Sequence, residues 1–166
     1  MVEYLLYVVG AFALIQLLYY VLVFLRLALF SADRAVQEST PAVSVLVCAW
    51  NERANLVELL PMLDQQDYPE FEVIVLDDRS HDGTEDFIRE NIADWKHIRY
   101  VRINDEFEHV TPKKYALTIG MKHANNPIAL MTDADCRPNS TDWIRSMSAG
   151  ISAQKDIVIG FSPYQK

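Results

Sequence analysis

The chain has 166 residues, of which 51% are hydrophobic, and a formal net charge of −8 at pH 7. This acidic balance argues against a nucleic-acid-binding protein with a broad basic surface, but it is compatible with binding of one nucleotide, whose phosphates a metal ion can offset. The two cysteines, Cys48 and Cys136, provide neither a disulfide framework nor a zinc set, so we expect both to be reduced core side chains in a cytosolic compartment.

The chain begins with an uncharged apolar segment, residues 4–25, with tyrosines near both ends that resemble the interfacial aromatics of membrane proteins. A helix of that length spans about 33 Å, which is enough to cross a hydrocarbon core of about 30 Å. A secretory signal peptide is the alternative, but it would need a basic start and a shorter apolar core. We therefore expect residues 1–30 to form a transmembrane anchor.

Basic residues follow this segment, whereas Glu3 precedes it. Arg26 and Arg34 therefore favour a single-pass membrane protein whose C-terminal part lies in the cytoplasm. Residues 31–41 are polar and end in a proline, which is typical of a linker, and residues 42–166 then form the expected domain.

Within this domain, short β-rich runs alternate with segments of helical periodicity. The expected strands cover residues 43–48, 71–76, 97–103, a run that begins at Ile128, and 157–159, and the expected helices cover residues 54–66, 84–93, 113–124 and 141–153. Pro61 is expected to bend or divide the first of these helices. The alternation predicts an α/β fold with a mostly parallel sheet and helices on its faces.

Two carboxylates follow the apolar run that begins at Ile128. Residues i and i+2 of an extended chain point to the same side, so Asp133 and Asp135 can converge on one point beyond the end of that strand. Ligands of open α/β sheets bind beyond the carboxyl ends of strands, and Mg²⁺ prefers carboxylate and phosphate oxygens. The pair therefore predicts a metal site, although acidic pairs of this kind are also common as solvated loop residues or helix caps.

A second acidic turn, Asp77 and Asp78, closes another expected strand. A carboxylate in that position can accept a hydrogen bond from a nucleotide base, such as the N3–H of uracil. Ser80 or Asp82 is expected to cap the helix that begins near Thr84, a role that leaves the first two carboxylates unexplained.

Other polar residues are weaker candidates. Lys113 and Lys114 could reach phosphates or could be solvated residues of a helix start, and Glu52 could face the crevice or be an exposed turn residue. Trp50 follows a strand and could line the same pocket or serve in packing. The sequence has no Gly-x-Gly-x-x-Gly and no Gly-Lys-Ser/Thr phosphate loop, which argues against a dinucleotide enzyme or a P-loop nucleotidase.

Four segments occur in an order and spacing that resemble a known family: Ser44–Glu52, Gln66–Thr84, Lys113–Leu117 and Thr132–Asp135. Together they resemble the nucleotide-binding part of a membrane-anchored family 2 glycosyltransferase with a GT-A fold. The resemblance covers about residues 42–160 and rests on the combination, since each segment alone is unspecific.

The resemblance implies a nucleotide-sugar donor, most often a UDP-sugar, with Mg²⁺ or Mn²⁺ as cofactor and a saccharide or lipid as acceptor. It implies that Asp77 or Asp78 holds the base, with Glu52, Asn51 and the backbone near Ala49 beside it. It further places Lys113 near the nucleotide, Asp133 near the ribose or the metal, and Asp135 on the metal. Such enzymes usually invert the anomeric carbon, with a carboxylate base that activates the acceptor hydroxyl.

The family's general base and the Gln-x-x-Arg-Trp motif of processive members are not found before Lys166, and Asp142 and Asp156 are poor candidates for the base. We therefore expect a glycosyltransferase domain that is incomplete at its C-terminus and that binds donor without full transfer activity. The alternatives are a membrane-anchored nucleotide-binding remnant without catalysis and a nucleotidyltransferase. The latter would bring a glycine-rich basic loop after the first strand, which this sequence lacks.

Overall fold

The computed structural model describes residues 1–29, 40–105, 110–152 and 154–160. The chain divides into two compact units, residues 1–34 and 35–166. Most of the predicted linker, residues 31–39, lies outside the described residues.

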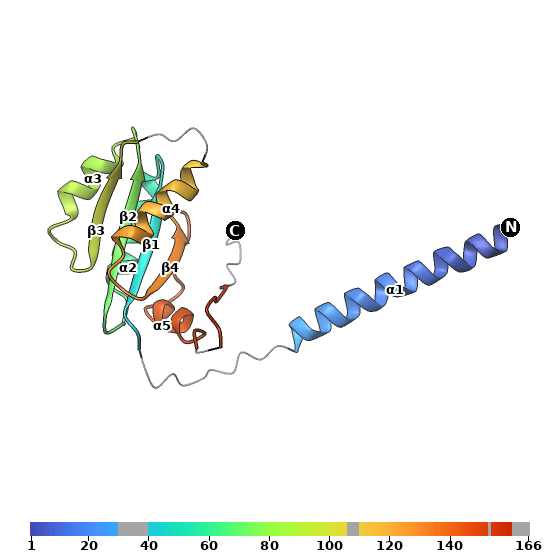
Figure 1. The fold of residues 1–166 in the computed structure, drawn as a ribbon. Helices are drawn as coiled ribbons and strands as arrows, with labels where there is room; N and C mark the ends of the chain where they lie inside the picture. Colours follow the sequence, from blue (N-terminus) through green and yellow to red (C-terminus); the bar gives the residue numbers. More distant parts are fainter. Residues whose placement is uncertain (30–39, 106–109, 153, 161–166) are drawn as a thin grey trace. The chain divides into compact units, whose positions relative to one another are not determined.

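The first unit is a single helix, α1 (Val2–Ala28), drawn in blue in Figure 1. Its described side chains are exposed, and the segment Val2–Arg26 is long and apolar enough to cross a membrane. The predicted anchor is therefore helical and has the length and composition of a membrane span.

The second unit is built on a four-stranded parallel sheet in the order β3-β2-β1-β4. Its strands are β1 (Val43–Ala49), β2 (Phe71–Asp78), β3 (Ile98–Ile103) and β4 (Ile128–Asp133). The chain runs outward from β1 through β2 to β3 and then returns to the other side of β1 as β4 (Figure 1). Such a reversal of strand order is the place where open α/β sheets bind ligands.

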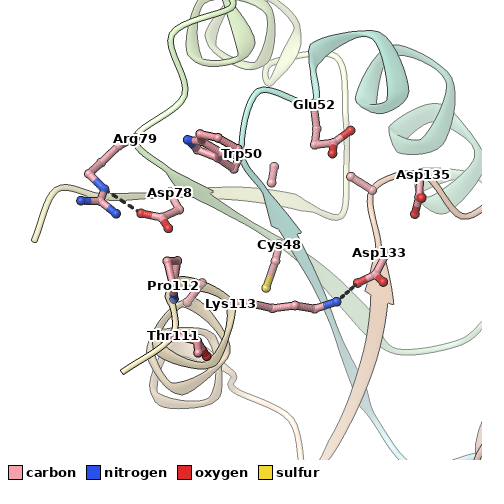
Figure 2. Close-up of a pocket in the computed structure, with 13 residues that line it drawn as sticks. Cys48, Trp50, Glu52, Asp78, Arg79, Thr111, Pro112, Lys113, Asp133 and Asp135 are labelled. Atoms are coloured by element: carbon pink, nitrogen blue, oxygen red, sulfur yellow. Dashed lines mark hydrogen bonds and ion pairs between the residues drawn. The ribbon is translucent and has the colours of Figure 1, made fainter. Parts of the chain in front are cut away.

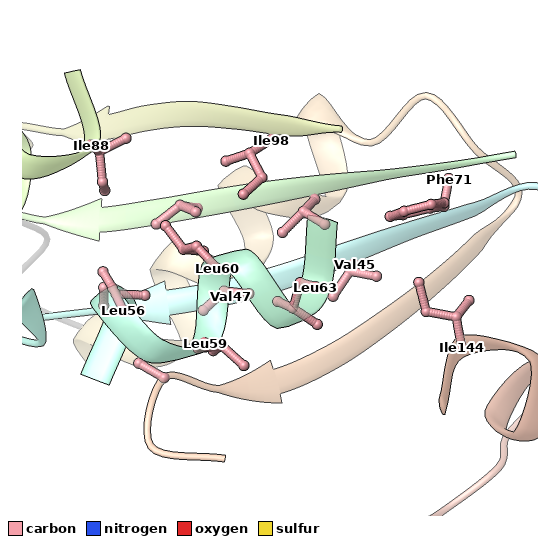
Figure 3. Packing of buried hydrophobic residues seen from close by; sticks show 14 of the residues in the cluster. Val45, Val47, Leu56, Leu59, Leu60, Leu63, Phe71, Ile88, Ile98 and Ile144 are labelled. Atoms are coloured by element: carbon pink, nitrogen blue, oxygen red, sulfur yellow. The ribbon is translucent and has the colours of Figure 1, made fainter. Parts of the chain in front are cut away.

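Helices cover both faces of this sheet. The strand residues that point to one face, such as Val45 and Val47, share a buried cluster with α2 (Arg53–Asp64), α3 (Thr84–Asn91) and α5 (Trp143–Ser148), as Figure 3 shows. The residues that alternate with them, such as Leu46 and Ile74, pack against α4 (Pro112–His123) on the other face. The predicted α/β fold class, a parallel sheet flanked by helices, is confirmed.

Helix α4 approaches the sheet closely at Gly120. A Cβ atom at this position would lie 2.5 Å from Cδ1 of Leu76 and 3.3 Å from Cδ1 of Leu46. Because both leucines are fully buried, they have little room to move away. The absence of a side chain at residue 120 therefore sets the distance between α4 and the strands whose ends form the site.

Two local expectations were wrong, and Pro61 does not divide its helix. The segment 157–159 forms no strand, and Ile157 and Ile159 are 80% and 91% exposed, because no neighbouring strand pairs with this β-prone run in the part of the chain that the structure describes. The last helix spans only 143–148 rather than 141–153, and α2 continues without interruption through Pro61.

The late start of α5 has a clear cause. The side-chain Nε2 of Gln66 donates to the carbonyl of Ser140 and its Oε1 accepts the N–H of Ile144, while the carbonyl of Thr141 accepts the N–H of Asp67. These bonds hold residues 140 and 141 against the turn that follows α2, so α5 begins only after them.

Candidate functional site

The carboxyl ends of β1, β2 and β4 and the start of α4 surround a cleft of about 600 Å³ (Figure 2). Its walls come from four segments that are far apart in sequence and meet at the reversal of strand order. The lining residues are Cys48, Ala49, Trp50, Glu52, Asp78, Arg79, Thr111, Pro112, Lys113, Ala116, Asp133, Ala134 and Asp135. Most of the polar residues singled out in the sequence thus lie around one cavity.

Asp77 and Asp78 have different environments. Asp77 is fully buried, and its carboxylate accepts hydrogen bonds from the N–H of Ser80 (3.0 Å), the hydroxyl of Tyr100 (2.7 Å) and the guanidinium of Arg102 (3.2 Å). Burial, together with the bond to Asp77, raises the pKa of Tyr100 to about 12, so this hydroxyl remains a donor. Asp77 therefore ties the end of β2 to β3 and is not among the residues that line the cleft.

Asp78 lines the cleft, as the alternation of side chains along a strand requires. Its Oδ1 accepts a hydrogen bond of 2.8 Å from Nε of Arg79, and only 11% of its side chain is exposed. Arg79 itself has a left-handed backbone with φ of 58° and also lines the cleft. Of the two candidate carboxylates, Asp78 is the one that lines the cleft.

Asn51 joins the β1–α2 loop to the β2–α3 loop. Its backbone is left-handed, with φ of 56°, a conformation that asparagine adopts more readily than most residues. Its N–H donates to Oγ of Ser80 (2.9 Å) and its Oδ1 accepts the N–H of His81 (2.7 Å). Asn51 is not among the residues that line the cleft, and its bonds join two loops that form the wall of the cleft.

The expected helix cap is different in detail. The N-cap of α3 is Gly83, with φ of 86°, rather than Ser80 or Asp82, because the hydroxyl of Ser80 is bonded to Asn51. Asp82 instead accepts the N–H of Thr84 (3.1 Å) and, with its other oxygen, the N–H of Arg53 (2.9 Å). One carboxylate thus satisfies the first N–H of both α3 and α2.

The acidic turn after β4 faces the start of α4. Asp133 and Asp135 both line the cleft and are both exposed. Nζ of Lys113 lies 2.6 Å from Oδ1 of Asp133, and this hydrogen bond raises the pKa of the Lys113 ammonium (Figure 2). Lysine and carboxylate therefore form a charged pair within the cleft.

The sequence pattern described as Glycosyl transferase family 2 matches residues 44–166, about three quarters of the chain. The chain belongs to this family. The fold and the resemblance inferred from the four sequence segments are thus confirmed together.

Two curated relatives are glycosyltransferases. The chain is 29% identical to glycosyltransferase AglE of Haloferax volcanii over 72% of its own length and 39% of the relative. It is 28% identical to the 4,4'-diaponeurosporenoate glycosyltransferase of Staphylococcus haemolyticus over 87% of its own length and 40% of the relative. The chain thus spans about two fifths of the length of the curated relatives that it matches.

Solved structures show the same architecture. The mannosyltransferase PcManGT of Pyrobaculum calidifontis, in complex with GDP-Man and Mn²⁺, superposes with a TM-score of 0.66 and 28% identity, over 80% of this chain and 39% of that one. TarS 1-349 of S. aureus, in complex with UDP-GlcNAc, gives a TM-score of 0.52 and 28% identity over 65% of this chain and 30% of that one.

In this glycosyltransferase domain, the donor set of the cleft fits a divalent cation that is shared with a substrate. Among the described residues, no three His, Cys, Asp or Glu side chains gather as a preformed metal site. Asp133 and Asp135 nevertheless offer hard oxygen ligands in one cavity, and Mg²⁺ commonly uses one or two carboxylates together with waters and phosphates. The chemistry of these two carboxylates therefore fits a cation whose other ligands would come from water and a diphosphate.

The sequence did not identify every residue of the cleft. Cys48, expected in the core, is partly buried and lines the cavity, where burial raises the pKa of its thiol to about 11 and keeps it neutral. Arg79, Thr111 and Pro112 also line the cavity. The position of Cys48 at a strand end was a usable signal, whereas no sequence signal marked Thr111 or Pro112.

Proposed function

We propose that the chain carries the donor-binding site of a metal-dependent, inverting glycosyltransferase that moves a sugar from a UDP-sugar to a saccharide or lipid acceptor. One observation carries this proposal. The acidic ends of β2 and β4, with Glu52 and Lys113, line a single cleft at the reversal of strand order. An acidic pair, a lysine and a recessed carboxylate are the groups that a metal-bound nucleoside diphosphate needs.

The base would be held by Asp78, beside Trp50 and the backbone of Ala49. Oδ1 of Asp78 accepts Nε of Arg79, and its other oxygen would accept an N–H of the base. Uracil presents one such N–H, at N3, and UDP is the nucleotide that the sequence resemblance implies most often. Glu52 lines the same cleft as a second acceptor for the nucleoside.

The diphosphate would lie between α4 and the acidic turn. Asp133 and Asp135 would hold Mg²⁺ or Mn²⁺, and a metal ion in this place supplies charge stabilisation for the departing diphosphate. Lys113 would exchange its contact with Asp133 for a phosphate oxygen. We assign no general base to a described residue, because the carboxylates that line the cleft are all committed to the donor side.

Helix α1 would anchor this domain to a membrane, with the domain on the cytoplasmic side. The basic residues that follow the apolar segment support this orientation.

The test is calorimetric titration of the full chain in detergent with UDP and with GDP, each with and without Mn²⁺. We expect binding of UDP that is strengthened by Mn²⁺ at least tenfold, and loss of that gain in Asp135→Ala. Asp94→Ala is the matched control, because Asp94 is an exposed carboxylate before β3, at the opposite end of the strands from the cleft. The proposal would be contradicted if the folded wild-type chain bound neither nucleotide. It would also be contradicted if Asp135→Ala bound UDP in the presence of Mn²⁺ as tightly as the wild type does.

A further inference from the structure

The guanidinium of Arg137 contacts the backbone of the acidic turn after β4, and each of its three nitrogens has a partner. Nη1 donates to the carbonyls of Ala134 (3.0 Å) and Cys136 (2.9 Å). Nη2 donates to Oδ1 of Asn55 (3.0 Å), and both Nε (3.1 Å) and Nη2 (3.0 Å) contact Oε2 of Glu58. Four hydrogen bonds and one further ion-pair contact therefore involve all three nitrogens of the guanidinium, and only 21% of the side chain is exposed.

Asn55 extends these contacts to the cleft. Because its Oδ1 accepts from Arg137, its Nδ2 is turned toward Glu52, whose Oε2 accepts a hydrogen bond of 2.6 Å. The reverse orientation of the amide would place its NH₂ against the guanidinium and its oxygen against the carboxylate. Arg137 therefore fixes the direction of the Asn55 amide and, through it, the carboxylate of Glu52.

The two groups that Arg137 holds belong to different walls of the cleft. Ala134 lies between the two carboxylates of the acidic turn, and Glu52 follows β1. Arg137 itself is not among the residues that line the cleft. We infer that Arg137 is a positioning residue, which sets the metal-facing turn and the nucleotide-facing Glu52 in one fixed relation. This inference rests on the proposed function.

A lysine could not replace this arginine. An ammonium group has three donors on a point charge, whereas the contacts of Arg137 point in several directions from a rigid plane. The three donors of an ammonium group are fewer than the four acceptors that the guanidinium contacts, which are the carbonyls of Ala134 and Cys136, Oδ1 of Asn55 and Oε2 of Glu58. Arg137→Lys therefore keeps the charge but releases part of the arrangement, which makes it a sharper test than Arg137→Ala.

The first measurement is titration of the full chain in detergent with UDP, with and without Mn²⁺. We expect Arg137→Lys to lower the gain in UDP affinity from Mn²⁺ about tenfold or more, because groups that orient metal ligands typically contribute about 10- to 100-fold. We expect Asn55→Ala to weaken UDP binding by the same few-fold factor with and without Mn²⁺, since it releases Glu52 but leaves the turn attached. Glu58→Gln is the control, expected within about twofold of the wild type, because Glu58 is 69% exposed and offers only a surface partner.

The inference would be overturned if Mn²⁺ raised the UDP affinity of Arg137→Lys as much as it raises that of the wild type. A loss of UDP affinity that is equal with and without Mn²⁺ would also overturn it, because a merely structural role predicts that result.

The second measurement is hydrogen exchange of the ligand-free chain. Arg137→Lys should speed exchange in residues 133–137 and in residues 52–56, while β3 keeps its wild-type rates. Unchanged exchange in both segments would overturn the inference even if UDP binding were altered. A wild-type chain that binds no UDP would instead overturn the proposed function, and exchange would still decide whether Arg137 holds the two segments together.

Discussion

At the scale of single residues, Asp77 is a buried charge with three hydrogen-bond donors around it. Asp77→Asn keeps the shape but replaces one acceptor oxygen by an NH₂ group, next to Arg102 and Tyr100. We expect a loss of about 3 kcal/mol in the free energy of unfolding, because one side of a buried charged pair is removed. Urea denaturation followed by circular dichroism checks this expectation.

The matched control is Asp78→Asn, at the neighbouring residue. It should change stability by less than about 1 kcal/mol and act mainly on UDP binding, since Asp78 contacts a partly exposed arginine at the cleft. Equal losses of stability in the two variants would contradict the different roles of the two carboxylates.

The sequence predicted two acidic turns at strand ends, and both line or support the cleft. The sequence could not show which of Asp77 and Asp78 lines the cleft. That difference depends on hydrogen bonds to Asp77 from Tyr100 and Arg102, which lie on β3. The contact of Arg137 with Asn55 joins residues that are 82 positions apart. Local patterns predict which residue types gather at a site, whereas hydrogen bonds over long separations decide what each one does.

At the scale of secondary-structure elements, Glu72 links three parts of the sheet. Its carboxylate accepts hydrogen bonds from Ser44 on β1 (2.7 Å), from Arg99 on β3 (2.5 Å) and from the N–H of Asn125 before β4 (2.7 Å). Burial alone would raise the pKa of Glu72, but the bonds from Asn125, Ser44 and Arg99 outweigh it and lower the pKa below its ordinary value of 4.5.

This lowered pKa predicts a pH dependence of stability. A carboxyl whose pKa is lower in the folded state stabilises the fold fully above its unfolded pKa, near 4.5, and loses that contribution as the pH falls through the folded pKa. Wild-type stability should therefore fall more steeply below about pH 5 than that of Glu72→Gln, as measured by urea denaturation at several pH values. Parallel curves for the two proteins would contradict this role of Glu72.

The contact of α4 with the sheet gives a second prediction at this scale. Gly120→Val should lower the free energy of unfolding by about 1–3 kcal/mol, because the new side chain overlaps buried Leu76 and Leu46. Met121→Val introduces the same β-branched residue at the next position of the helix, where the side chain is 51% exposed, and should change stability by about 0.5 kcal/mol or less. Thermal or chemical denaturation of the pair separates overpacking from helix propensity.

The sequence predicted the elements that carry a full hydrophobic face and failed where that face is absent. The strands at the centre of the sheet are largely apolar runs, and helices with apolar residues at helical spacing follow them. The run 157–159 has the same β propensity, but Ile157 and Ile159 are exposed. A segment of high β propensity forms a strand only where a partner strand is available.

At the scale of the whole molecule, α1 adds an apolar surface to a domain with its own core. We expect the full chain to be recovered in the membrane fraction and to resist extraction with alkaline carbonate, because burial of this helix in lipid is strongly favourable. Removal of residues 1–30 should move the protein to the soluble fraction with its UDP affinity unchanged within about twofold. Recovery of the full chain in the soluble fraction would contradict the anchor.

The bonds of Asn51 with Ser80 and His81 have a consequence for the thermodynamics of donor binding. They join two loops of the cleft before any ligand arrives, so these loops do not have to be ordered by the ligand. Binding through a preorganised wall avoids much of the conformational entropy that mobile loops would lose. The measured heat of UDP binding should therefore report contacts with the nucleoside rather than the ordering of these two loops.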